Sequence, residues 1–183
     1  MAKAIGLIEY KTVSSGMTAT DIMAKSADIE ILQAETVCPG KYFALVEGEV
    51  AAVQSAVNAA KKAIPEKLID DFVLGNPHES IFRAIWGTTE VDQPEALGIL
   101  ETYSIAQAIV GADIAAKAAD VKLIELRLGR GMCGKSYLLI TGQVAAVTMA
   151  IEKAKSSAGE YGMYLDSSVI ARPDMKAWRK FVM

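Results

Sequence analysis

The sequence predicts an α+β protein made of two tandem ferredoxin-like units, each with the element order β-α-β-β-α-β. The first observation behind this prediction is an internal repeat: residues 4–9 (AIGLIE) return as 96–101 (ALGILE), and residues 21–28 return as 113–120, both 92 residues further on. Between residues 40 and 61, 11 of 22 positions match those 94 residues further on. A single duplication explains this pattern better than a solenoid does. We therefore expect domains at residues 1–91 and 92–183, joined near the polar stretch 88–94.

The second observation is that each unit shows the same succession of local patterns. Apolar, β-branched runs predict strands, an Ala-rich stretch without Gly or Pro predicts a helix, and Cys38-Pro39-Gly40 predicts a turn. Val50, Val53, Val57 and Ala60 share one helical face. The expected elements of the first unit are strand 3–10, helix 17–27, strand 28–36, strand 41–47, helix 49–63, strand 69–75 and a short helix from about residue 78.

Composition excludes several classes of protein. Of the 183 residues, 52% are hydrophobic, which excludes a disordered chain. The formal net charge is −3, whereas nucleic-acid-binding domains are typically basic. No apolar run reaches the roughly 18 residues that a membrane span needs, and the N-terminus lacks the apolar stretch of a signal peptide. We therefore expect a cytosolic protein that binds neither nucleic acid nor membrane.

The two cysteines and the single histidine limit the possible metal chemistry. Cys38, Cys133 and His78 cannot supply four zinc ligands within one chain, and a structural disulfide is not expected in the cytosol. Two interpretations of Cys38 stay open. It is either a small buried residue or an exposed thiol in a Pro-Gly turn, where three copies on a threefold axis would supply three thiolates. For Cys133 we favour a small residue in a Gly-rich turn.

Three other features favour structural roles over catalysis. Residues 129–136 match the phosphate-loop pattern G-x-x-x-x-G-K-S, but a β-like segment follows them where that motif requires a helix. His78 follows Pro77 and opens the short helix, which fits a helix-start or interface residue. Glu9 and Glu101 are equivalent by duplication, and we expect a structural role for both. The sequence therefore does not predict an enzyme.

The repeated motifs, taken together, resemble those of the bacterial microcompartment (BMC) shell domain. These are A-I-G-L-I-E, then D-x-x-x-K-x-A-D, then G-K with G-x-V-A-A-V, and finally V-I-x-R-P. The resemblance covers nearly the whole chain twice, as in the tandem-domain shell proteins that form trimers. Within this family, residues 36–41 (TVCPGK) resemble the propanediol-utilisation type. The resemblance implies a structural protein of the microcompartment shell, in which three chains form a pseudohexameric tile with a central pore.

The resemblance also implies roles for individual residues. Cys38 matches a cysteine that binds an iron–sulfur cluster, of the [4Fe-4S] type and one per trimer, which implies electron transfer across the shell. The loops that would surround the pore contain Cys38, Pro39, Gly40, Arg130, Gly131, Met132 and Cys133. Contacts between neighbouring tiles would involve Lys25, Lys117, Asn76 and Arg172, although Asn76 departs from the arginine of the family motif. Arg130 would make the pore mouth positive.

The implied partners are two further copies of the chain, other shell proteins, and a redox enzyme or small metabolites at the pore. One alternative is a metal-free gated pore for metabolites, in which Cys38 only lines the channel. An alternative of another class is a nucleotide-binding enzyme that uses the loop of residues 129–136. Nucleotide binding that is lost on replacement of Lys135 would favour this enzyme.

Overall fold

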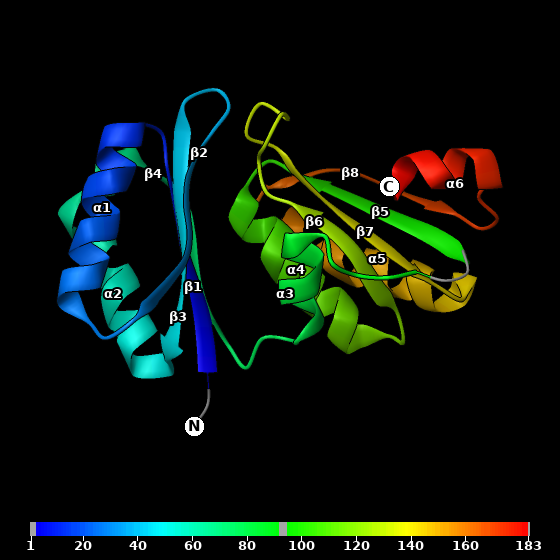
Figure 1. Cartoon of the computed structure of the whole chain (residues 1–183), viewed down its shortest axis with the longest axis horizontal. Helices are drawn as coiled ribbons and strands as arrows, with labels where there is room; N and C mark the ends of the chain where they lie inside the picture. The colour runs from blue at the N-terminus through cyan, green and yellow to red at the C-terminus, as the bar shows by residue number, and fades with distance from the viewer. Residues whose placement is uncertain (1–2, 92–94, 183) are drawn as a thin grey trace. The chain divides into compact units, whose positions relative to one another are not determined.

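The chain folds into two four-stranded antiparallel sheets, each with two long helices on one face (Figure 1). The structure is a computed structural model and describes residues 3–91 and 95–182. It divides into two compact units. Unit 1 contains residues up to Pro77 together with Gly129–Gly134, and unit 2 contains His78–Leu128 and the chain from Lys135 onward.

Unit 1 has the sheet order β2-β3-β1-β4. Strand β1 pairs with β3 from Lys3↔Glu49 to Tyr10↔Tyr42, and with β4 on its other side. Helices α1 and α2 lie side by side on one face, over a core that includes Ile8, Met23 and Val57. The elements are β1 (Lys3–Tyr10), α1 (Val13–Ser26), β2 (Glu30–Val37), β3 (Lys41–Glu49), α2 (Val50–Ala63), the 3-10 turn η1 (Pro65–Lys67) and β4 (Leu68–Gly75).

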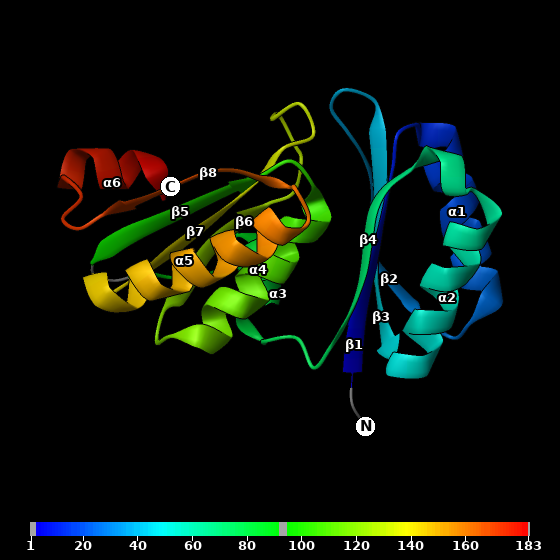
Figure 2. The ribbon, with the colours of Figure 1, turned by 180° about the vertical axis from the view of Figure 1, so that it is seen from behind.

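Unit 2 repeats this plan with the sheet order β6-β7-β5-β8. Helices α4 and α5 lie together on one face, and α6 lies away from them (Figure 2). Trp178 of α6 is buried against Leu97, Ile124 and Leu139. The elements are α3 (Ser80–Trp86), β5 (Ala96–Thr102), α4 (Ile105–Ala118), β6 (Lys122–Arg127), β7 (Ser136–Gly142), α5 (Val144–Glu160), β8 (Tyr164–Ile170) and α6 (Met175–Phe181).

The glycine of the repeated A-I-G and A-L-G motifs has the same packing role in both units. A Cβ atom on Gly6 would lie 2.6 Å from Cγ1 of Val53, and one on Gly98 would lie 2.7 Å from Cγ1 of Val147. The first strand of each unit therefore needs glycine where the second long helix crosses it. The close approach of helix to strand therefore explains why the glycine of this motif occurs in both repeats.

The predicted element order is confirmed, with one clear difference in bounds. Helix α1 begins at Val13, four residues before the expected start at residue 17. The segment Val13-Ser-Ser-Gly16 has low intrinsic helix propensity. Gly16 is nevertheless buried, and a Cβ atom there would lie 2.5 Å from Cβ of Tyr42. Packing against β3 therefore stabilises a helical turn that the local sequence disfavours.

The compact units divide the chain at residues 77 and 78, because helix α3 packs against β6 and α4 of unit 2. The boundary predicted at residues 91 and 92 concerns the repeat in the sequence and stays a prediction. It borders residues 92–94, which lie outside the described residues. The duplicated sequence unit and the compact unit are thus different divisions of the chain.

Tyr10 should make unit 1 sensitive to alkaline pH. Its buried hydroxyl donates a hydrogen bond to the carbonyl oxygen of Ala60 at 2.9 Å. Burial, reinforced by the charges of Asp71 and Glu66, raises the pKa of Tyr10 from 10.0 to about 12. Stability from this group is complete below pH 10. It is lost as the pH rises toward 12, because the unfolded chain releases the proton first.

Between pH 10 and 12, Tyr10 should therefore steepen the fall in unfolding free energy by up to about 1.4 kcal/mol per pH unit. Urea unfolding at pH 8 and pH 11 measures this slope. Tyr10→Phe should flatten it, and Tyr161→Phe should not, since Tyr161 is 65% exposed. Equal slopes in both variants would contradict the assignment.

Candidate functional site

The turn predicted at Cys38 joins β2 to β3 at the end of unit 1. Val37 pairs with Lys41, and the backbone N–H of Gly40 donates to the carbonyl oxygen of Val37 at 2.9 Å. Gly40 has φ = 96°, a left-handed conformation that suits glycine. The peptide bond between Cys38 and Pro39 is cis. Cys38 is a free, exposed cysteine, which confirms that this turn does not bury it.

The longer loop of residues 129–134 joins β6 to β7. Gly129, Gly131, Cys133 and Gly134 all have positive φ angles, of 71°, 70°, 53° and 78°. Cys133 is the non-glycine member of this set, and its thiol is free and exposed. The Gly-rich sequence therefore serves a tightly folded loop that presents a second thiol.

An ion pair connects this loop to β2. Nε of Arg130 donates to Oε2 of Glu35 at 2.7 Å, and its terminal nitrogen Nη2 contacts both oxygens of the same carboxylate. The hydrogen bond with Glu35 raises the pKa of Arg130. The arginine side chain is 65% exposed, so solvent weakens the pair. The positive charge expected from Arg130 is thus largely offset by Glu35.

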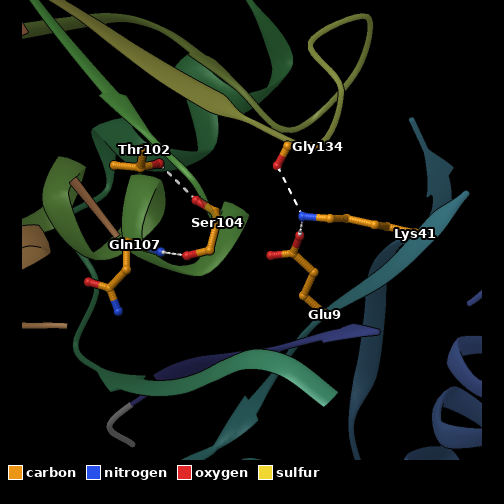
Figure 3. A network of polar contacts seen from close by, with 6 residues as sticks. All are labelled: Glu9, Lys41, Thr102, Ser104, Gln107 and Gly134. Carbon is orange, nitrogen blue, oxygen red and sulfur yellow. Dashed lines mark hydrogen bonds and ion pairs between the residues drawn. The ribbon is translucent and has the colours of Figure 1, made fainter. Parts of the chain in front are cut away.

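A second, more buried contact lies below the loop (Figure 3). Nζ of Lys41 lies 3.1 Å from Oε1 of Glu9, whose side chain is fully buried, and 3.5 Å from the carbonyl oxygen of Gly134. A buried carboxylate needs such a countercharge. Glu9 therefore supports the sheet and the loop, in line with the structural role expected for it.

The phosphate-loop pattern lies in the wrong structural context for nucleotide binding. The residues after the loop, from Ser136 to Gly142, form strand β7 and not a helix. The loop consequently lacks the helix N-terminus that holds phosphates in that motif. His78 also fits the structural expectation, since it precedes α3 and its Nδ1 lies 2.7 Å from Oγ of Ser80.

The residues expected at tile edges belong to α1, to α4 and to the segments that follow β4 and β8. Lys25 pairs with Asp21 at 2.6 Å, and Lys117 pairs with Asp113 at 2.7 Å, each one helical turn apart. Asn76 follows β4 with φ = 52°, and Arg172 is exposed after β8. Contacts of these four residues with a neighbouring tile stay a prediction.

Sequence reasoning missed Glu35 and Lys41, the two residues whose side chains contact the loop of residues 129–134. No sequence pattern could have paired Glu35 with Arg130, because the two residues lie 95 positions apart in the chain. For Lys41 a sequence signal did exist, because Glu9 lies in an apolar strand and a buried glutamate requires a nearby cation. Among residues 3–91 and 95–182, no three His, Cys, Asp or Glu side chains gather as a metal site.

The two repeated sheets, each with its own hairpin loop, define a chain made of two tandem copies of one domain. The BMC domain family model matches residues 4–77 and 96–173, so the chain belongs to the BMC domain family. No helix among the described residues is long and apolar enough to cross a membrane.

Individual relatives agree with this family. The chain is 41% identical over 182 residues to the bacterial microcompartment shell protein PduT of Citrobacter freundii, covering 100% of this chain and 99% of PduT. It also resembles the crystal structure of a microcompartment protein from Desulfitobacterium hafniense DCB, with a TM-score of 0.87, 43% identity, and coverage of 98% and 99% of the two chains. A fused, permuted hexameric shell protein of the RMM microcompartment shares the fold, with a TM-score of 0.69, 24% identity, and coverage of 87% and 85%.

The chain is therefore a structural shell protein of a bacterial microcompartment, similar to PduT. The expectations of a tandem BMC fold, of a place in the shell and of a protein that is not an enzyme are confirmed by these relatives.

Proposed function

We propose that three copies of the chain form a pseudohexameric tile whose central pore binds one iron–sulfur cluster through Cys38. The observation that carries this proposal is the exposed, free thiol of Cys38 at the end of the β2–β3 hairpin. Duplication within one chain supports a ring of three copies, because six similar domains then close around one axis.

The donor groups fit a cluster shared between chains. The described part of one chain offers no group of three metal-binding side chains, so Cys38 would be one ligand of a larger set. Three thiolates from three copies would hold three irons of a [4Fe-4S] cube and leave the fourth iron open to another ligand. Such a cluster supplies one-electron transfer, which would serve redox exchange across the shell.

The neighbouring residues would hold the ligand in place. The turn of Pro39 and Gly40 keeps the Cys38 thiol exposed, and the pairs Glu35–Arg130 and Glu9–Lys41 fix the strands and the loop on either side. In this proposal Gly131, Met132 and Cys133 also face the pore. Other shell proteins would contact the tile edge, and a redox enzyme or small metabolites would meet the pore.

The test is anaerobic purification, with iron and sulfide measured per chain alongside the mass of the assembly. We expect about four irons and four sulfides per three chains. Cys38→Ser should remove the iron and the brown colour but keep the trimer. Cys133→Ser is the matched control, because Cys133 is the other free, exposed thiol, and it should keep the iron.

Two results would contradict the proposal. A trimer without iron, even after reconstitution with iron and sulfide, would favour the metal-free metabolite pore. Loss of the trimer on Cys38→Ser would show that Cys38 has a structural role.

A further inference from the structure

The internal duplication allows the same surface to be compared in two environments. The face formed by α1 and β2, here called the α1–β2 face, corresponds to the α4–β6 face 92 residues further on. Met17 is 54% exposed, whereas its equivalent Ile109 is 0% exposed. Ile31 is 42% exposed, whereas its equivalent Leu123 is 0% exposed. Equivalent apolar side chains are thus buried in unit 2 and exposed to solvent in unit 1.

In unit 2, the end of the first repeat lies against this surface. Helix α3 packs against β6 and α4, with Ile81 and Ala84 fully buried. The backbone N–H of His78 donates to Oδ1 of Asp113 at 2.8 Å. Lys117 pairs with the other oxygen of this carboxylate, whose side chain is only 6% exposed. The segment 76–86 is therefore fixed by apolar packing and by one specific hydrogen bond.

In unit 1 the equivalent carboxylate, that of Asp21, is exposed to solvent. Asp21 forms the same helical pair with Lys25 as Asp113 forms with Lys117, but its side chain is 58% exposed. The equivalent of segment 76–86 is segment 172–182, since Pro77 and Pro173 correspond in the repeat. By this equivalence, the backbone N–H of Asp174 matches that of His78.

We propose that the α1–β2 face of one copy binds segment 172–181 of a second copy, with the N–H of Asp174 donating to Asp21. This inference rests on the proposed trimer and names the surface that joins its chains. Repeating the contact from copy to copy would close the ring.

Charge complementarity supports a second copy as the occupant. Segment 172–181 exposes Arg172, Lys176, Arg179 and Lys180, together with the apolar side chains of Met175 and Phe181. The α1–β2 face exposes Asp21, Asp28 and Glu30 around Met17 and Ile31. At the position of Glu30, the α4–β6 face has Lys122, so the charge of this face changes where the basic helix α6 replaces α3.

Helix α6 can bind a neighbour without leaving its own unit. Trp178 anchors it against Leu97, Ile124 and Leu139, while Met175 and Phe181 stay 47% and 44% exposed. Its outer surface is thus free for a second contact, and no exchange of domains is required.

The test uses disulfide trapping in a Cys38→Ser, Cys133→Ser background. Asp21→Cys with Asp174→Cys should form disulfides between chains on mild oxidation, giving a covalent ladder that ends at three chains. Both positions are exposed, so neither cysteine opens a cavity; Asp174→Cys does remove the N-cap that its side chain forms with the N–H of Lys176, at a cost of about 1 kcal/mol. The matched control is His78→Cys with Asp113→Cys, which occupies the same geometry within one chain and should form an internal disulfide without a ladder.

The outcomes separate this inference from the proposed function. A trimer that gives no ladder, while the control forms its internal disulfide, would overturn the proposed contact and leave the tile intact. If the chain with both native cysteines is itself monomeric, both the contact and the tile are overturned. A trapped trimer, together with a native protein that holds no iron after anaerobic purification, would overturn only the cluster.

Discussion

Lys41→Met is expected to lower the free energy of unfolding by about 3–5 kcal/mol, because it takes the lysine away from a fully buried carboxylate. Methionine has nearly the same length, so the cost comes from the lost charge and not from a cavity. The contact of Nζ with the carbonyl oxygen of Gly134 is lost as well. At fixed protein concentration, a loss of this size lowers the melting temperature by roughly 10 °C.

Two further variants test the cause. Lys135→Met changes the equivalent lysine in the second repeat, where Glu101 is only partly buried, and should cost less. Glu9→Gln combined with Lys41→Met removes both charges and should recover part of the loss. If Lys41→Met is no more damaging than Lys135→Met, the buried carboxylate does not depend on Lys41.

Local patterns predicted the elements wherever local and tertiary preferences agree. The apolar run of β1 and the Cys38-Pro39-Gly40 turn lie where expected, because β-branched residues favour strands and Pro-Gly favours a turn. The start of α1 was wrong by one turn, since burial of Gly16 against Tyr42 outweighs the weak helix propensity of Val13-Ser-Ser. Such a tertiary effect has no local pattern to reveal it.

The candidate site was predictable only in part, for the same reason. The sequence left Cys38 as either a small buried residue or an exposed thiol in a Pro-Gly turn, and in the structure the thiol is exposed. The pairs Glu35–Arg130 and Glu9–Lys41 join residues 95 and 32 positions apart, so no local spacing identifies them. Long-range pairs depend on how the hairpins fold, which the duplication alone does not specify.

Gly16→Ala is expected to destabilise unit 1 by about 1–3 kcal/mol, although alanine is the better helix former. The new methyl group would lie 2.5 Å from Cβ of Tyr42, an atom attached directly to the backbone of β3. Helix α1 must therefore move away from the sheet. Denaturant unfolding followed by circular dichroism measures the loss, and Ala24→Gly gives the ordinary propensity difference at an exposed position of the same helix.

The second repeat provides the compensating change. Its residues at the positions of Gly16 and Tyr42 are Ala108 and Ser136, so a larger helix residue there accompanies a smaller strand residue. Gly16→Ala with Tyr42→Ser gives the first repeat the same pair, and the double variant should lose less than the sum of the two single losses. Since the two side chains touch, the coupling should reach about 1 kcal/mol or more. If the two losses are simply additive, the side chains at positions 16 and 42 do not together determine how closely α1 packs on the sheet.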